Sequence, residues 1–472
     1  MSKNDQIIKL EDLLKKAEKR LKSFFRNKRT YRYVFYGVIV IVLVGAGLAW
    51  YMFNKEEVAP AKAGWWNDSW NYRKAIVINN EYVTADLTDF PLLVSLIDEN
   101  LGDHAQDDGD DIVFVANNGE KLAHEIESFA TTTSGSIATG TLVAWVKIPS
   151  LSSTEDTTIY LYYGNAGVAD QSDAANVWDD NYVMVQHMAS TSPTTRYDST
   201  KNNNDGTTSG YEGDEATTTA KINGADDFDG SDDHIDVTDN PSLGGMGGLT
   251  ISAWVRFDQM PTTAGQNALI VEKRHVGEPY VSYIFDVRQN GGLVDELYFA
   301  VRNDSGDAQN TEGDTSLATS TWHYIVGTWD GTDLHVYLDG QLDDGMSNTQ
   351  SGTVYDSNSD LVINYSSQID GQIDEVRISK VGRSPAWIKT SYNNQNATST
   401  FYAIQSEEVG PGPVGYWAFD KGYGTIAEDS SANNNDGTIT GAVWQDESMC
   451  VSGKCLYFDG SDDYVEVADF DL

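Results

Sequence analysis

Short runs in which apolar and polar residues alternate follow one another through most of the chain. From Trp65 onward, segments rich in Val, Ile, Tyr and Thr are separated by turns of Gly, Asp and Asn. Ile251, Ala253, Val255 and Phe257, for example, occupy alternate positions and would share one face of a strand. Many short strands of this kind predict an all-β protein made of tandem β-sandwich modules.

The N-terminal part departs from this pattern. Residues 34–53 carry no charge, and twenty helical residues at ~1.5 Å each would span ~30 Å, the thickness of a bilayer core. Residues 1–33 hold 11 Lys and Arg against 4 Asp and Glu, an excess that places the N-terminus in the cytoplasm. The sequence therefore predicts a single-pass signal anchor in the cell membrane with the bulk of the chain outside the cell. A cleaved signal peptide is the alternative.

Charge is distributed unevenly along the sequence. The whole chain carries a net charge of −41, although its first 33 residues are basic. A body this anionic excludes nucleic acid as a partner, because phosphates are bound by Lys and Arg. The acidic excess fits a solvated surface protein, a salt-rich habitat, or carboxylates that bind cations.

One phrase of ten residues occurs twice, at Asp198–Thr207 and at Asp429–Thr438. Each copy is followed, about twenty residues later, by Phe-Asp-Gly-Ser-Asp-Asp, at Phe228–Asp233 and Phe458–Asp463. The same two phrases in the same order indicate a duplicated module. Because few residues follow the second copy, we expect residues 414–472 not to fold stably alone.

Further phrases of the first copy resemble a known family. They are Leu249–Val255, Trp322–Gly331, Val336–Gly340 and Gly371–Ile378. With the two repeated phrases, they resemble the laminin-G-like, concanavalin A-like jelly-roll domains of microbial surface proteins. The resemblance covers residues 181–405, and residues 414–472 resemble the opening of a second such domain.

Residues 65–180 resemble a different family, the domain of unknown function 2341. The phrases that carry this resemblance are Trp70–Lys74, Phe90–Val94, Gly109–Phe114, Leu122–Glu127, Ala144–Pro149 and Tyr160–Asn165. The expected organisation is a basic cytoplasmic arm (1–33), a membrane anchor (34–53), a linker (54–64), the 2341-like module (65–180), a complete laminin-G-like domain (181–405), a linker (406–413) and a truncated second domain (414–472).

Glycoside hydrolysis is the clearest enzymatic option for such a fold. It needs two carboxylates across a sugar, which related enzymes often place as a Glu-x-Asp-x-Glu triplet on one strand. The nearest approach is Asp370–Glu375, where Asp374 and Glu375 are adjacent and would point to opposite faces. Glu125 and Glu127 share a face in the other module. We therefore expect no enzyme and name no catalytic residue.

Calcium is the metal that the sequence favours. It binds six to eight oxygens from carboxylates, amides and carbonyls, and the repeated phrases supply such groups on turns. The resemblance to laminin-G-like domains implies Asp198, Asn204, Asp229 and Asp374 as ligands. The alternative is that these residues form turns, with their side chains bonding nearby backbone N–H groups.

The sequence contains two cysteines, Cys450 and Cys455. Outside the cell they can form a disulfide, which would contribute roughly 2 kcal/mol because the loop is short. Two free thiols are the alternative.

The expected function is non-catalytic recognition at the cell surface. The partner would be a glycan or another surface protein, bound by lectin-like modules whose loops calcium orders. One alternative is a structural spacer in a larger stalk or adhesin. Another is an accessory or degenerate glycoside hydrolase domain.

Overall fold

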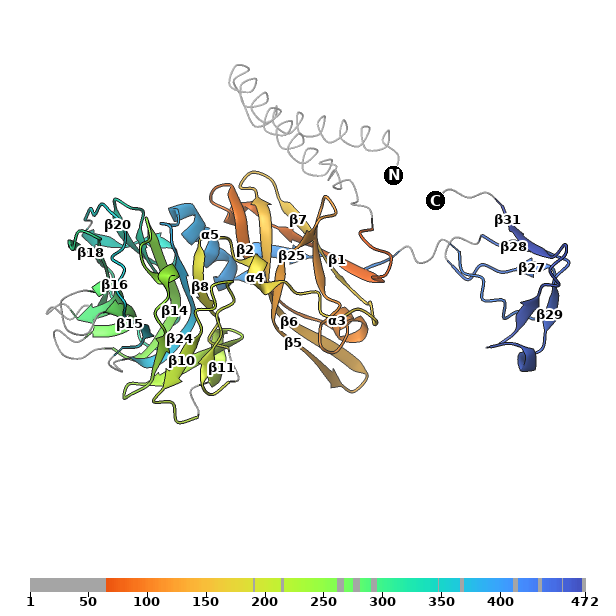
Figure 1. Cartoon of the computed structure of the whole chain (residues 1–472), viewed down its shortest axis with the longest axis horizontal. Helices are drawn as coiled ribbons and strands as arrows, with labels where there is room; N and C mark the ends of the chain where they lie inside the picture. Colours follow the sequence, from red (N-terminus) through yellow and green to blue (C-terminus); the bar gives the residue numbers. More distant parts are fainter. Residues whose placement is uncertain are drawn as a thin grey trace, which may run out of the picture. The chain divides into compact units, whose positions relative to one another are not determined.

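The computed structural model describes most of the chain from Trp65 to Ala468 (Figure 1). Residues outside the described part are 1–64, 190–191, 214–215, 261–266, 275–280, 290–294, 347, 366–368, 411–414, 432–434, 452 and 469–472. The predicted arm, membrane anchor and first linker therefore lie outside the described residues. Within the described part no helix is long and apolar enough to cross a membrane. That part is predominantly β-strand, as the alternating pattern predicts.

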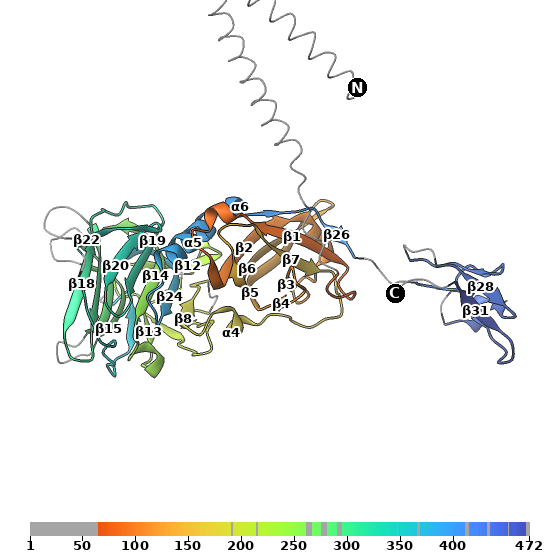
Figure 2. The same cartoon turned by 90° about the horizontal axis from the view of Figure 1, so that it is seen from above.

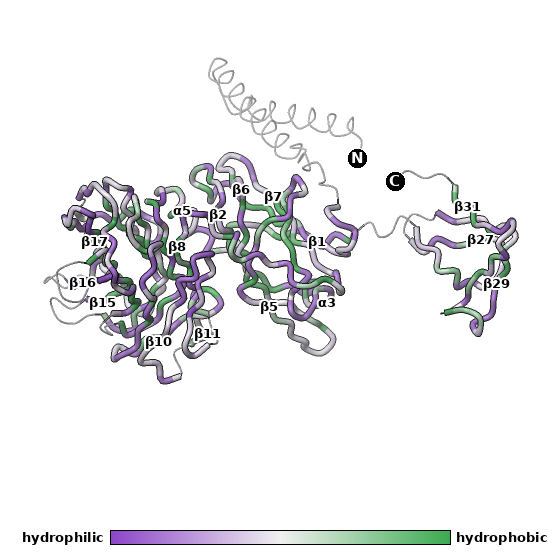
Figure 3. The backbone as a smooth tube through the Cα atoms, viewed as in Figure 1, coloured by the Kyte–Doolittle hydropathy of each residue, from purple (hydrophilic) through white to green (hydrophobic). Residues whose placement is uncertain are grey.

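Two antiparallel sheets form the first module. The larger has the order β25 (Tyr402–Ile404), β1 (Tyr72–Ile78), β7 (Thr157–Tyr163), β3 (Val113–Ala116), β4 (Lys121–Leu122), with β26 (Glu408–Val409) also paired to β1. The smaller has the order β2 (Leu87–Asp98), β6 (Ile137–Leu151), β5 (His124–Ser134). Two short helices, η1 (Asn80–Tyr82) and α3 (Glu99–His104), join them, and a third, α4 (Ala174–Val177), follows β7 on the way to the second module. Apolar residues lie along strands such as β6 and β7 (Figure 3) and fill one shared core.

The second module is a sandwich of two larger antiparallel sheets. The nine-stranded sheet has the order β22 (Asp344–Met346), β18 (Ala308–Gly313), β17 (Asp295–Arg302), β16 (Val281–Gln289), β15 (Asn267–Arg274), β23 (Leu361–Ile363), β13 (His234–Val237), β10 (Gly206–Ser209), β9 (Thr195–Arg196). The eight-stranded sheet has the order β11 (Ala216–Ile222), β12 (Gly224–Asp229), β24 (Asp370–Ser379), β14 (Leu249–Gln259), β19 (His323–Trp329), β20 (Leu334–Leu338), β21 (Gln341–Leu342), with β8 (Tyr182–Gln186) paired to β24. The short helix η2 (Pro241–Leu243) follows β13.

Strand β14 shows how the pattern produces this sandwich. Its alternate residues Ile251, Ala253, Val255 and Phe257 are buried in the core between the two sheets, as predicted. Trp254 points the other way and belongs to a separate apolar cluster on the outer face of the eight-stranded sheet. Both faces of this sheet are therefore covered, as in a central layer.

Helix α5 (Pro385–Asn396), followed by α6 (Thr398–Phe401), covers that outer face (Figure 2). Ser384 caps α5 by accepting a hydrogen bond from the backbone N–H of Trp387, and Pro385 occupies its first turn. Ile388 packs with Trp254 in the outer apolar cluster. Trp387 also lies edge-on against Phe90 of the first module, with the ring centroids 5.3 Å apart.

The two modules share structural elements. Strands β25 and β26, which follow the second module in sequence, complete the sheet of the first. The core of the first module likewise includes Val185, Ile222 and Phe401. Strand β26 lies within the predicted linker 406–413, and its Glu408 forms an ion pair with Arg73 at 2.9 Å. Strands from both sides of the predicted module boundaries therefore pair in the same sheet.

Side chains from the second half of the chain also cover the open edge of β2. Asn394 accepts a hydrogen bond from the backbone N–H of Leu93 at 2.7 Å and donates one to its carbonyl at 3.1 Å. The hydroxyl of Tyr402 likewise accepts a hydrogen bond from the backbone N–H of Ser95 at 2.8 Å and donates one to its carbonyl at 2.9 Å. Unpaired edge groups attract other strands, so this cover protects the fold.

The C-terminal segment contains two small sheets and the short helix η3 (Glu447–Met449). Their strands are β27 (Ile426–Ala427), β28 (Gly437–Thr440) and β31 (Tyr464–Val467) in one, and β29 (Val443–Gln445) and β30 (Cys455–Tyr457) in the other. Ala427 and Ile439 are buried, but several larger apolar side chains are exposed, among them Val443, Tyr457 and Tyr464.

Candidate functional site

The first copy of the repeated phrase forms a hydrogen-bonded turn around Asp198. Its buried carboxylate accepts four hydrogen bonds at 2.8–2.9 Å, from the N–H of Val185, the N–H and hydroxyl of Thr200, and the N–H of Asn204. The backbone N–H of Asp198 donates to Asp205. The carboxylate thus ties strand β8 to the turn that follows it.

The second copy repeats this arrangement. Asp429 accepts hydrogen bonds from the N–H of Tyr416, the N–H and hydroxyl of Ser431, and the N–H of Asn435. Its own N–H donates to Asp436. The duplicated phrase is therefore a duplicated turn, which is one of the two roles expected for it.

The four predicted calcium ligands do not come together in one place. Asp198 lies with Asn204 in the turn just described, whereas Asp229 groups with Asp232 and Asp233 in a separate acidic turn. Asp374 lies in a third place, where its Oδ2 accepts a hydrogen bond from the N–H of Ile222 at 2.8 Å. The sequence spacing could not show this, because Asp198, Asp229 and Asp374 lie on different elements of the fold.

Strand β24 contains a bulge at Glu375. Asp374 is opposite Trp254 and Arg377 is opposite Ser252, so two residues of β24 face one residue of β14. Glu375 has a φ of +56°, a left-handed conformation that residues other than glycine rarely adopt. The bulge breaks the regular alternation that would separate Asp374 from Glu375. Both carboxyl groups instead interact electrostatically with His187.

His187 stands at the centre of a buried polar cluster where the two modules meet. Its Nδ1 lies 2.8 Å from Glu375 Oε1 of β24 and 3.7 Å from Glu127 Oε2 of β5. Its Nε2 lies 3.4 Å from Glu125 Oε2, also of β5. The side chains of Glu375 and Glu127 are 0% and 4% exposed. Their charges are therefore stabilised by neighbouring charged groups and not by water.

Each carboxylate in this cluster also has a fixed hydrogen-bond donor. Trp145 donates its indole N–H to Glu127 at 2.9 Å, and Arg377 donates to Glu375 at 3.0 Å. Trp178 donates its indole N–H to Glu125 at 3.0 Å. These donors hold the carboxylates in place around the imidazole.

Burial and charge shift the pKa values within the cluster. Burial by itself would lower the pKa of His187, but Glu375, Glu125 and Glu127 raise it well above its usual value. Burial, opposed by His187, raises the pKa of Glu127 to about 7. Burial followed by the neighbouring Glu375 raises the pKa of Asp374 well above the usual range.

A second polar constellation lies on the outer face of the nine-stranded sheet, which we call the open face. The inner face of these strands is apolar, with residues such as Phe285 and Phe299 in the core. The alternate residues Asp286, Arg288 and Tyr298 therefore point outward. The nine-stranded sheet is the layer of the second module that lies farther from α5 among the described elements (Figure 2). The open face is the side of that sheet that points away from the core.

Asp286 and Arg288 hold one another on the open face. Arg288 Nε donates to Asp286 Oδ1 and Oδ2 at 3.0 and 3.1 Å, and its guanidinium lies over the ring of Tyr298. Burial raises the pKa of Asp286 to about 7. The charge of Arg288 opposes this increase, and the carboxylates of Glu272 and Glu312 add to it. Asp286 and Glu272 are buried beneath this face, whereas Arg288, Tyr298 and Glu312 are partly exposed on it.

A polar cavity of about 350 Å³ lies beside the Asp198 turn, lined in part by Lys201, Asn202, Ser242 and Lys380. Its described lining contains no aromatic side chain. Lys201 pairs with Asp180 on its rim. This cavity offers hydrogen bonds but no ring on which a sugar would stack.

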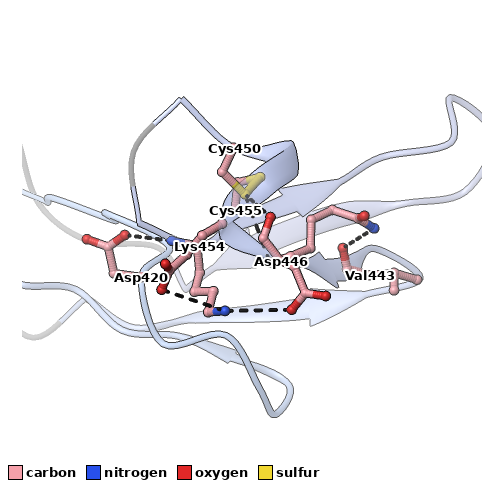
Figure 4. Close-up of a disulfide and its surroundings, with 8 residues drawn as sticks. Asp420, Val443, Asp446, Cys450, Lys454 and Cys455 are labelled. Atoms are coloured by element: carbon pink, nitrogen blue, oxygen red, sulfur yellow. Dashed lines mark hydrogen bonds and ion pairs between the residues drawn. A yellow bond between two sulfur atoms is a disulfide. The ribbon is translucent and has the colours of Figure 1, made fainter.

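Cys450 and Cys455 form a disulfide in the C-terminal segment (Figure 4). Close to it, the backbone N–H of Lys454 donates to Asp420 at 3.2 Å, and Lys454 Nζ lies 3.7 Å from Asp446. The disulfide and these contacts hold the short strand β30 next to η3, where few apolar side chains are buried.

Sequence reasoning found neither His187 nor the open face as a site. His187 follows β8 by one residue and gives no motif, because its partners come from strands that are distant in the sequence. The open face carried a weak signal: Asp286 and Arg288 interrupt an apolar strand at alternate positions. That pattern is common to any half-exposed strand and did not single them out.

Two family models match the chain, and both confirm the resemblances that the motifs indicated. Residues 229–389 match the concanavalin A-like lectin/glucanases superfamily. Residues 108–205 match the domain of unknown function DUF2341. This second match contains Glu125, Glu127 and His187, whereas Glu375 and the open face lie in the first. No curated protein sequence matches the chain.

Solved structures overlap with parts of the chain. Domain 4 of AbnA, a GH43 extracellular arabinanase from Geobacillus stearothermophilus in complex with arabinotriose, is 18% identical, with 45% of this chain and 98% of that chain covered and a TM-score of 0.35. The binding domain of botulinum neurotoxin serotype D is 14% identical, with 47% and 53% covered and a TM-score of 0.35. The chain thus spans about half of the neurotoxin domain. TM-scores this low reflect partial overlap of the backbones and say nothing about ligands.

Proposed function

We propose that the second module binds a glycan, without cleaving it, on the open face of its nine-stranded sheet. The observation that carries the proposal is the pair of partly exposed side chains Arg288 and Tyr298, which the buried carboxylate of Asp286 holds in place from beneath. Sugar hydroxyls donate to carboxylates and accept from guanidinium groups. A site that is ordered before binding spends less free energy on ordering its side chains.

The family match supports this assignment of the ligand class. The segment that matches the lectin/glucanase superfamily includes β15 to β18, the strands that carry the open face. A net charge of −41 for the chain favours a neutral or basic ligand over a polyanion. A neutral oligosaccharide fits both observations.

Glycoside hydrolysis is the second candidate, and the raised pKa of Asp286 favours it. A carboxylic acid that keeps its proton near pH 7 has the property of a general acid. Against this role, Arg288 binds both oxygens of Asp286, and Glu272 is itself paired with Arg274. Binding without cleavage therefore fits the contacts better.

Display at the cell surface belongs to the same proposal. The uncharged segment 34–53 with the basic residues 1–33 before it supports a membrane anchor. Calcium stays part of the proposal at the turn of Asp229, Asp232 and Asp233, whose carboxylates lie within 4.8 Å of one another. The carboxylate of Asp198 already accepts four hydrogen bonds.

A glycan microarray probed with the full chain in detergent tests the proposal. We expect retention of a defined set of neutral oligosaccharides, with no release of reducing sugar when the retained glycan is incubated with the chain. Cleavage that Asp286→Asn abolishes would instead establish the hydrolase. Absence of binding across the array would reject both assignments of the open face.

A further inference from the structure

The buried cluster around His187 has the composition of a metal centre. We propose that Glu127, His187 and Glu375 bind one divalent transition-metal ion, with zinc as the reference ion, where the two modules meet. One donor atom from each of the three residues lies within 4.8 Å of the other two. Imidazole nitrogen with carboxylate oxygens is a donor set that zinc and related first-row ions prefer.

The separations between the donor atoms fit such an ion. Zinc binds imidazole nitrogen and carboxylate oxygen at about 2.0–2.2 Å, so two ligands of a tetrahedral ion lie ~3.3 Å apart. His187 Nδ1 lies 2.8 Å from Glu375 Oε1 and 3.7 Å from Glu127 Oε2. These two values lie on either side of the expected separation, and the donor oxygens of Glu127 and Glu375 lie within 4.8 Å of one another, so the two carboxylates need only close around the ion.

Surrounding residues complete the arrangement. Glu125 faces Nε2 of His187, the nitrogen turned away from the other two carboxylates. A carboxylate in this position orients a metal-binding imidazole and keeps its proton on the far nitrogen. Trp145 and Arg377 donate hydrogen bonds to Glu127 and Glu375, as groups around a metal usually do for ligating carboxylates.

Charge in the cluster favours a bound cation. Three carboxyl groups, those of Glu125, Glu127 and Glu375, face His187, while the cation Arg377 pairs with Glu375. Glu127 Oε1 and Asp374 Oδ1 are buried oxygens that accept no hydrogen bond within the described part of the chain. An unsatisfied buried acceptor is costly, and an ion held by Glu127 offsets that cost at its carboxylate.

The location of the cluster indicates what the ion would do. Its ligands come from β5 of the first module, from the end of β8 and from β24 of the second. The side chains of His187, Glu127 and Glu375 are 9%, 4% and 0% exposed, so the fourth coordination position of the ion would be closed to a bulky substrate. The ion is therefore structural and ties the two modules together.

Metal analysis of the full chain, purified without a histidine tag, tests this proposal. We expect about one zinc ion per chain after exposure to Zn²⁺ and gel filtration. The variants His187→Asn and Glu127→Gln should lose the ion, and His323→Asn should keep it, because His323 pairs with Asp339 elsewhere in the second module. Chelation of the wild-type chain should lower its Tm, and Zn²⁺ but not Ca²⁺ should restore it.

A second measurement covers variants that fail to fold. Loading the chelated wild-type chain with Co²⁺ should produce the visible absorption of a tetrahedral cobalt site. A wild-type chain that takes up neither Zn²⁺ nor Co²⁺, and whose Tm neither ion changes, would overturn the proposal. The charge of the cluster would then be balanced by bound protons. Equal zinc content in wild type and His187→Asn would overturn it as well.

Discussion

The imidazole Nδ1 of His187 lies 2.8 Å from Oε1 of Glu375, and this contact joins residues 188 positions apart in the sequence. Glu125 and Glu127 of the first module face the same ring. Together with the strands and core residues that the modules share, this contact makes the two modules one structural unit. A unit of this kind should unfold cooperatively.

Asn394→Ala tests that coupling from the side of α5. The amide of Asn394 satisfies both backbone groups of Leu93 at the edge of β2, so its loss leaves two buried groups without partners. We expect a decrease of about 2–4 kcal/mol in the free energy of unfolding. Asn396→Ala, at an exposed position of the same helix, is the matched control and should cost well under 1 kcal/mol. Unfolding in urea followed by tryptophan fluorescence measures both, and equal effects would contradict the coupling.

The turn around Asp198 should contribute strongly to stability. Asp198→Ala removes the acceptor of four hydrogen bonds, three of them from backbone N–H groups. We expect a loss of about 2–4 kcal/mol. Asp229→Ala, in an exposed turn with one such bond to Ser231, should cost under ~1 kcal/mol. A smaller loss for Asp198→Ala than for Asp229→Ala would contradict the structural role of the repeat.

Calcium should distinguish these two turns. If the Asp229 turn binds the ion, adding Ca²⁺ raises the Tm of the wild-type chain and of Asp198→Asn, but not that of Asp232→Asn. Differential scanning calorimetry with and without EGTA measures the effect. A Tm that is the same in calcium and in EGTA would reject calcium at this turn.

Asp286 should make stability depend on pH. Its pKa of about 7 in the folded state exceeds that of an unfolded Asp, near ~3.9. The folded state therefore holds a proton that the unfolded state releases, and the stability this proton contributes is lost as pH rises from ~4 through ~7. Relative to Asp286→Asn, the wild-type chain should lose stability between pH 5 and pH 8.

Asp179 serves as a control because its pKa is shifted in the opposite direction to that of Asp286. Burial would raise its pKa, but hydrogen bonds and the charge of Arg383 outweigh burial and lower it. Its stabilising effect is thus present above ~3.9 and lost only at more acid pH. Asp179→Asn should therefore destabilise the chain equally at pH 5 and pH 8. Parallel pH profiles for wild type and Asp286→Asn would contradict the assignment for Asp286.

The sequence predicted the β-sandwich class because strand alternation reports directly on which face is buried, as Ile251 and Phe257 show. It did not predict α5, whose polar composition hides its helical period, although the Ser384-Pro385 start signal was present. The bulge at Glu375 was also hidden, since no residue type demands it. The sequence singled out Glu125, Glu127 and Glu375 as carboxylates but not their meeting at His187, because contacts between distant strands leave no local pattern.

Reduction of the Cys450–Cys455 disulfide should affect the C-terminal segment alone. The closed loop is short, so we expect a loss of roughly 2 kcal/mol there. Limited proteolysis should then cleave residues 414–472 sooner, while the main unfolding transition of the two modules stays unchanged. A lower Tm of the main transition after reduction would show that this segment stabilises the modules.

The central claim is that the open face binds glycan, and a binding titration of two arginine variants tests it most directly. Arg288→Gln removes the guanidinium between Asp286 and Tyr298, whereas Arg256→Gln removes one paired with Asp258 at 3.0 Å on the other sheet. With a glycan retained on the array, we predict affinity weakened by about tenfold or more for Arg288→Gln and unchanged for Arg256→Gln. Equal affinities for Arg288→Gln and the wild-type chain would contradict the account.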